Sequence, residues 1–134
     1  MSAANFSNPT PFVYSSQTLT RAERSLICSP FKYTLFAAMG CDRVAIGEIT
    51  GNKGFEKGYT KRLLSELVAD NELVWLIQVG VLRREVDGQG ITDSFRLTPL
   101  GRNLVEEYQT KPWRNPSWSD RIYETITRWL RLPF

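Results

Sequence analysis

The chain has 134 residues, of which 42% are hydrophobic and 23% charged, and this suits one domain with an ordinary core. Seventeen Lys and Arg against 14 Asp and Glu give a net charge of +3, which is compatible with a nucleic-acid partner but too small to predict one. The sequence has no histidine, which excludes Ser-His-Asp and Cys-His catalytic sites and His-ligated metals.

Two cysteines, Cys28 and Cys41, are too few for a zinc site and are predicted to be buried, reduced thiols, with one disulfide as the alternative. The first residues show neither the basic nor the apolar part of a secretion signal, and no apolar run reaches 18 residues. We therefore expect a cytoplasmic protein outside the membrane, without metal or cofactor.

The N-terminal residues 1–19 are rich in Pro, Ser, Thr and Asn and are predicted to form an irregular arm. After them, Thr20 and Glu23 have the spacing of a capping box, which predicts that the first helix begins there. We expect Pro30 to break this helix, because proline lacks the amide proton that a helix interior needs.

A second helix is predicted over residues 31–39, where the apolar side chains share one face. Ser29 is expected to cap it with Pro30 in its first turn, and Gly40 is expected to end it. Residues 41–50 could form a short helix or a short strand, and their periodicity does not decide between the two. Three glycines in residues 51–58 predict a loop.

Residues 59–79 show the clearest helical spacing of leucine, valine and isoleucine. Asp70 and Asn71 interrupt it, so we expect two helices, 59–69 and 71–79, with one continuous helix as the alternative. Gly80 should end this helical region.

A β-hairpin is predicted next, with strands over 81–86 and 94–97 joined by the turn residues 87–90. Thr98 should then cap a helix whose first residue is Pro99.

The last helix is predicted over residues 119–131, after a loop that contains Trp113 and Trp118. Ser117 and Asp120 fit a capping box at its start. One apolar stripe runs along this helix at the spacing i, i+4, i+7, i+8. Its members are Ile122, Ile126, Trp129 and Leu130.

The segment from Gly80 to Leu104 resembles winged-helix transcriptional regulators. In that superfamily a helix ends in Gly and two apolar residues, a basic strand and a polar turn form the wing, and a strand ending in Leu-Thr-x-x-Gly leads into a helix. The matching residues here are Gly80-Val81-Leu82-Arg83-Arg84, Asp87-Gly88-Gln89-Gly90 and Leu97-Thr98-Pro99-Leu100-Gly101. The whole chain is also similar, more faintly, to a small cyanobacterial family described as heterocyst-differentiation regulators.

The resemblance implies a mainly α fold with a two-stranded hairpin, winged helix-turn-helix-like, with an added C-terminal helix. The domain would cover residues 20–110, between the arm 1–19 and a C-terminal segment 111–134 that supplies a loop and a dimerisation helix. Upstream of Gly80 the spacing is about half of that in a usual helix-turn-helix, so it stays open which helix enters the major groove.

The first functional hypothesis is a regulator that binds double-stranded DNA as a homodimer, with the sequence 53–62 carrying a net charge of +3. The candidate DNA-binding residues are Lys53, Lys57, Tyr59, Thr60, Lys61, Arg62, Ser65, Arg83, Arg84 and Arg96. The candidate dimer interface is the C-terminal stripe. The alternatives without a binding function are that the basic segment is a solvated loop and that the C-terminal stripe covers the core of the domain itself.

The second hypothesis is a protein-interaction module on the same fold. It is favoured by the modest net charge, by three acids that offset the hairpin arginines, and by aromatic residues in the C-terminal segment. A helix lying on a membrane surface is a third possibility. An enzyme is the weakest hypothesis, because no residue pattern in the sequence predicts catalysis.

Overall fold

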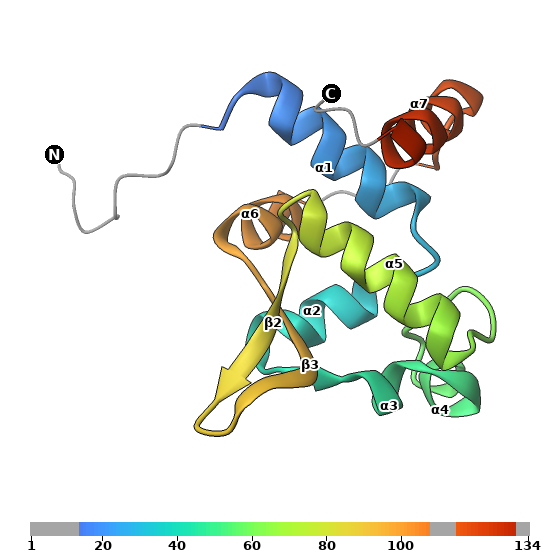
Figure 1. The fold of residues 1–134 in the computed structure, drawn as a ribbon. Coiled ribbons are helices and arrows are strands. Elements are labelled where there is room, and N and C mark those ends of the chain that lie inside the picture. Colours follow the sequence, from blue (N-terminus) through green and yellow to red (C-terminus); the bar gives the residue numbers. More distant parts are fainter. Residues whose placement is uncertain (1–13, 108–114, 131–134) are drawn as a thin grey trace, which may run out of the picture.

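The computed structural model describes residues 14–107 and 115–130 of the chain (Figure 1). Within these ranges the protein is mainly helical, with seven helices and one three-stranded antiparallel sheet. In chain order the elements are α1 (Ser16–Cys28), α2 (Tyr33–Cys41), β1 (Val44–Ala45), α3 (Ile46–Ile49), α4 (Gly51–Glu56), α5 (Glu66–Gln78), β2 (Leu82–Asp87), β3 (Gly90–Leu97), α6 (Pro99–Glu107) and α7 (Trp118–Leu130).

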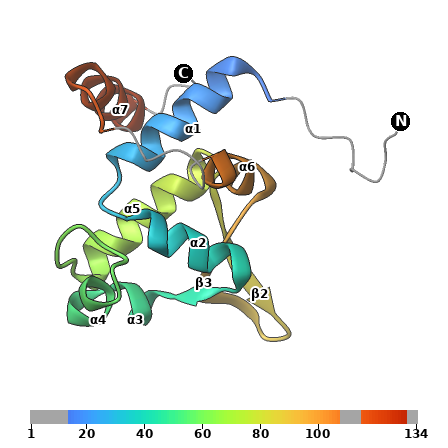
Figure 2. The ribbon, with the colours of Figure 1, turned by 180° about the vertical axis from the view of Figure 1, so that it is seen from behind.

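Helix α5 crosses the middle of the molecule, with α1 above it, α2 behind it and the sheet at one side (Figures 1 and 2). The core between these elements is apolar, and Phe31, Phe36 and Phe95 are its largest fully buried side chains. The rings of Phe31 and Phe36 meet edge to face with centroids 6.3 Å apart. Each such ring removed from water stabilises the fold by roughly 1.5–3 kcal/mol.

The predicted hairpin forms, but the sheet has three strands instead of two. Strand β1 pairs with the outer edge of β3, so the strand order is β1-β3-β2. Val44 lies opposite Phe95, and both side chains are buried. The sequence did not decide whether residues 41–50 form a helix or a strand. They form both, because strand β1 is followed directly by helix α3.

The first helix begins earlier than predicted. Ser15 caps it, since the Ser15 hydroxyl accepts a hydrogen bond from the Thr18 amide at 3.1 Å. The predicted capping box at Thr20 is therefore wrong, and the predicted arm is too long at its C-terminal end. Residues 1–13 of that arm lie outside the described part of the chain.

The predicted break at Pro30 is confirmed, but the second helix begins at Tyr33. Ser29 belongs to the end of α1, because its hydroxyl donates to the Leu26 carbonyl at 2.7 Å. The predicted stop at Gly40 is also wrong, since α2 continues through it to Cys41.

The glycine-rich segment 51–58 is not a loop, because it contains α4. Gly54 lies so close to α3 that a Cβ atom there would come within 1.8 Å of the Ile49 carbonyl oxygen. Close packing between α3 and α4 thus explains this glycine better than a flexible loop does.

Residues 59–65 are not helical, so the predicted helix 59–69 is wrong. They run beside the segment that joins α1 to α2, with hydrogen bonds from Lys32 N to Tyr59 O and from Lys61 N to Pro30 O at 2.9 and 2.8 Å. The single helix α5 begins after Ser65, whose hydroxyl accepts from the Val68 amide. It continues through Asp70 without interruption.

The local signals around the hairpin are confirmed. Gly80 ends the helical region with φ +92°, the left-handed region that glycine adopts without strain. Thr98 caps α6, since its hydroxyl accepts from the Gly101 amide at 3.0 Å. The capping box of Ser117 and Asp120 also forms, and α7 begins one residue earlier than predicted.

Candidate interaction surfaces

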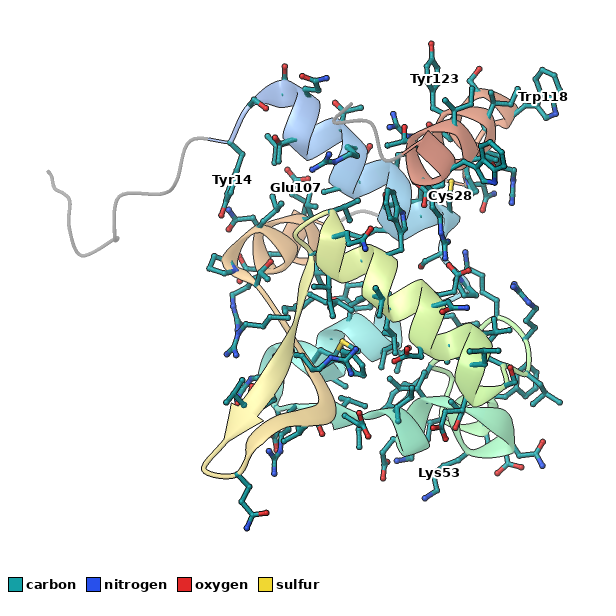
Figure 3. The ribbon with its side chains drawn as sticks, in the orientation of Figure 1. Tyr14, Cys28, Lys53, Glu107, Trp118 and Tyr123 are labelled. Atoms are coloured by element: carbon teal, nitrogen blue, oxygen red, sulfur yellow. The ribbon has the colours of Figure 1, made fainter. Side chains whose placement is uncertain are left out.

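The predicted DNA-binding residues of the 53–65 segment do not form one helix face. Lys53 lies exposed in α4 (Figure 3), and Lys57 follows the end of that helix. Tyr59 is half-buried, and Thr60 is fully buried in an isolated β-bridge with Phe31. The Thr60 side chain is therefore closed to any base edge.

Two of the lysines in this segment have partners inside the chain. The Lys57 ammonium is paired with the Glu48 carboxylate, which raises the pKa of Lys57 and lowers that of Glu48. The Lys61 ammonium donates to the Ile27 carbonyl at 3.2 Å. Burial lowers the pKa of Lys61, and the charge of Arg121 acts in the same direction. Arg62 is exposed, and Ser65 serves as the cap of α5.

The three hairpin arginines are also paired with acids. Arg83 and Arg96 both face the Glu85 carboxylate, at 3.2 and 3.7 Å. Arg84 lies 3.6 Å from both Asp70 and Asp93, and its guanidinium stacks over Phe95. The hairpin therefore neutralises its own positive charge.

Helix α5 carries a surface that the sequence analysis missed. Glu66, Asp70 and Glu72 are its charged residues, and between Ser65 and Gln78 the sequence has no Lys or Arg. The exposed part of the helix also includes Leu67, whose side chain is 72% exposed. The charged residues of 65–78 would have predicted this acidic helix from the sequence, because they are all Asp or Glu.

Helix α7 lies beside α1 (Figure 1), and polar side chains of α7 contact both α1 and α5. Glu124 is buried in this contact and accepts two hydrogen bonds, from the Ser25 hydroxyl and from the Trp75 indole, both at 2.8 Å. Burial raises the pKa of Glu124, and the two hydrogen bonds oppose that shift in part. One carboxylate thus joins three helices.

Arginines from both sides complete this polar contact. Arg128 of α7 donates to the Glu72 carboxylate at 2.8 Å and lies over the Trp75 ring. Arg24 of α1 donates to the buried Thr127 hydroxyl at 3.4 Å and lies over the Tyr123 ring. The sequence patterns did not predict this polar contact between α1, α5 and α7.

The apolar stripe of α7 lies at the surface, and its Trp129 borders a groove that α7 forms with α5. Trp118 and Trp129 are 80% and 83% exposed, and Ile122 and Ile126 are 39% and 40% exposed. Figure 3 shows the Trp118 side chain pointing outward from α7. Three of the predicted interface residues therefore lie at the surface, whereas the side chain of Leu130 lies outside the described part of the structure. We call Trp118, Ile122, Ile126 and Trp129 the outer stripe.

A groove of about 530 Å³ runs between α5 and α7. Val74 and Trp75 from α5 face Thr125 and Trp129 from α7 across it. The polar part of its lining includes Glu124 and Arg128, which already hold α7 in place. The groove is therefore a consequence of how α7 is docked.

The chain was compared with known protein families, curated proteins and solved structures. A family model described as Npun_F0494-like matches residues 12–128. No curated protein and no solved structure matches the chain. Across the described residues, every helix is too short or too polar to span a bilayer.

Proposed function

We propose that the chain, which belongs to the Npun_F0494-like family, is a winged-helix-type domain that binds protein and not double-stranded DNA. The order of its elements supports the winged-helix assignment: two short helices precede α5, and the hairpin β2–β3 follows it. In helix-turn-helix proteins the second helix of the motif enters the major groove. Helix α5 holds that position in this order.

The charge of α5 is the observation that carries the proposal. DNA presents one negative charge for about every 1.7 Å of helix axis, and its binding proteins neutralise phosphates with Lys and Arg. Helix α5 has no Lys or Arg to offer the phosphates and would bring the carboxylate of Glu66 to them, while its other acids, Asp70 and Glu72, already pair with Arg84 and Arg128. Like charges brought together in this way disfavour the complex.

The positive charges elsewhere in the chain do not compensate for the lack of Lys and Arg on α5. Five of the candidate DNA-binding residues already have partners inside the chain, so a phosphate would have to compete for them. These are Lys57, Lys61, Arg83, Arg84 and Arg96. An existing ion pair reduces the counterion release that drives DNA binding.

The outer stripe of α7 supports the protein-binding half of the proposal. Isolated apolar residues at a surface are ordinary, but contiguous apolar patches mark interaction sites. Tryptophan is enriched among the residues that dominate binding energy at protein interfaces. Trp118 and Trp129 are both more than three-quarters exposed, on one side of one helix.

A binding titration tests directly the proposal that the chain does not bind double-stranded DNA. Fluorescence anisotropy with a random-sequence duplex, repeated over a series of salt concentrations, should show no more than weak binding near physiological salt. The contrary outcome is tight binding with a steep salt dependence that the variant Lys57→Ala/Lys61→Ala/Arg62→Ala weakens at every sequence. That outcome would restore the DNA-binding regulator predicted from the sequence.

A gain-of-binding variant tests whether α5 holds the position of a groove-binding helix. Glu66→Lys/Asp70→Lys changes the charge of its surface by four units and releases Arg84 from Asp70. We expect salt-dependent DNA binding to appear in this variant. The matched control Glu106→Lys/Glu107→Lys makes the same charge change at the exposed end of α6. Equal binding by both variants would show only a general charge effect.

We also propose that the protein acts in the cytoplasm. Both cysteines are free, and Cys41 is exposed. Exposed unpaired thiols suit a reducing compartment, since oxidising compartments favour their conversion to disulfides.

A further inference from the structure

We infer that the outer stripe of α7 binds the outer stripe of a second copy of this chain, with the two α7 helices antiparallel about a two-fold axis. This inference rests on the proposed protein-binding function and names its partner. It is carried by the spacing of the four residues, by the chemistry of the opposite side of α7, and by the extent of the exposed surface.

The outer stripe has nearly the same order in both directions. Its residues are Trp, Ile, Ile and Trp, separated by four, four and three positions. At 3.6 residues per turn they occupy about 80° of the helix circumference, so one neighbouring helix can contact all four. The buried Glu124 and Thr127 lie on the opposite side of the helix.

An antiparallel arrangement of two α7 helices places residues of the same type beside each other. When two copies of α7 lie antiparallel, Trp118 of one copy is level with Trp129 of the other, and Ile122 is level with Ile126. The rise of 1.5 Å per residue leaves an offset of only about 0.75 Å between the two sets. A two-fold interface requires a patch that is complementary to itself, and the outer stripe meets that condition. The antiparallel arrangement also sets the helix dipoles in the favourable direction.

The other side of α7 argues against a lipid surface as the partner. A helix that lies on a membrane uses the Lys and Arg of its polar side to contact anionic headgroups. In this chain the polar side of α7 is packed on α1 and α5, and Arg128 is bonded to Glu72. Arg121 is the exposed cation of the described helix.

The exposed surface suits a modest affinity. A tryptophan side chain buries about 150–250 Å² in an interface, so the two indoles of each copy contribute about 300–500 Å². Interfaces of this small size belong to the weaker, exchanging complexes. We therefore expect a dimer whose dissociation constant lies in the micromolar range.

Sedimentation velocity of the full chain tests the inference, at concentrations from low micromolar to several hundred micromolar. The wild type should shift from monomer to dimer across this range. Trp129→Lys should raise the dissociation constant at least tenfold. Its side chain is exposed in the monomer, so we expect the circular dichroism spectrum and the unfolding transition of the monomer to be retained. The matched control Val86→Lys alters another exposed apolar residue, in the hairpin, and should dimerise like the wild type.

A charge-swap pair tests the antiparallel register. Trp118→Lys and Trp129→Glu should each weaken self-association when studied alone. Mixed together, they should associate more tightly than either does, because the antiparallel pair places the new lysine beside the new glutamate and leaves the two remaining indoles in contact. In a parallel pair each charge would meet an indole, and mixing would restore nothing.

Three results would overturn the inference. One is a wild type that stays monomeric at several hundred micromolar. Another is a dimer that Trp129→Lys leaves intact. The third is binding of the wild type to vesicles of phosphatidylcholine and phosphatidylglycerol that Trp129→Lys abolishes while no dimer forms. None of these results depends on DNA, so the DNA titration separates failure of this inference from failure of the proposed function.

Discussion

Glu124 is the residue whose side chain does most to fix the position of α7. Its carboxylate is the acceptor for the Ser25 hydroxyl and for the Trp75 indole. Glu124→Ala would leave both buried donors without an acceptor, so we expect it to lower the free energy of unfolding by about 1–3 kcal/mol. Urea unfolding followed by circular dichroism measures this change. A loss much below that range would mean that water replaces the carboxylate.

The raised pKa of Glu124 has a consequence for pH. Below the ordinary value of 4.5 the carboxyl is protonated in the folded and unfolded chains alike, and its full contribution to stability is present. As the pH rises, the unfolded chain ionises first, so the free energy of unfolding falls until the pH has passed the raised pKa. Glu124→Gln does not ionise and should flatten this slope.

Urea unfolding of both proteins from about pH 4 to pH 7 measures the difference in slope. The control Glu106→Gln alters an exposed glutamate at the end of α6 and should leave the slope unchanged. Parallel profiles for the wild type and Glu124→Gln would show that Glu124 does not titrate in this window.

The prediction that both cysteines are buried is wrong for Cys41, which is exposed, so the two thiols should differ in reactivity. Burial and the neighbouring Glu124 raise the pKa of Cys28 to about 11, whereas Cys41 is exposed. The thiolate is the nucleophile, so a thiol-specific reagent near pH 8 should modify Cys41 at least tenfold faster. Cys41→Ser should remove the fast phase. Fewer than two reactive thiols in the denatured protein without reductant would instead reveal a disulfide.

At the level of elements, α6 depends on a glycine that allows a close backbone contact. A Cβ atom at Gly101 would lie 2.2 Å from the Val81 carbonyl oxygen, so Gly101→Ala forces the start of α6 away from β2. We expect a loss of about 1–3 kcal/mol in the free energy of unfolding. Gly88→Ala is the matched control, since a Cβ atom there meets nothing within 4 Å. Equal stability of the two variants would contradict this role for Gly101.

The elements that the sequence predicted well are those with local signals. Gly80, Thr98 and Ser117 act within a few residues of their own positions, through a left-handed stop and two helix caps. The hairpin and the last two helices were therefore placed to within a few residues. Pro30 likewise breaks the chain locally, because it has no amide proton to donate.

The elements that the sequence predicted wrongly depend on contacts between distant residues. The segment 59–65 has helical spacing, but Lys61 bonds to Pro30 across the chain and holds it extended. Gly54 contributed to the prediction of a loop, but in the structure this glycine packs closely against the backbone of Ile49. The apolar stripe of α7 was predicted correctly as a pattern, but its outward direction depends on Glu124 contacts with Ser25 and Trp75, 99 and 49 residues away.

At the scale of the whole molecule, the paired charges of the hairpin lie apart from the exposed tryptophans of α7 (Figure 1). The three hairpin arginines are paired with acids, and Lys57 is paired with Glu48, whereas α5 has no Lys or Arg of its own. Trp118 and Trp129 of α7 are the most exposed large apolar side chains among the described residues, and Phe55, Leu63 and Leu67 expose further apolar surface on and between α4 and α5. The sequence total of +3 conceals this division, because it averages over surfaces that face different directions.

This division links association to the stability of the whole chain. If α7 holds the second copy, then dimerisation stabilises the folded state by mass action, and the midpoint of thermal unfolding should rise with protein concentration. A hundredfold increase in concentration above the dissociation constant stabilises each chain of a homodimer by about 1–1.5 kcal/mol, which corresponds to several degrees for a domain of this size. Trp129→Lys should show a smaller rise in midpoint over the same concentrations, whereas Val86→Lys should follow the wild type. Differential scanning calorimetry at several concentrations measures the midpoints, and a wild-type midpoint that does not move would show that the folded chain unfolds as a monomer.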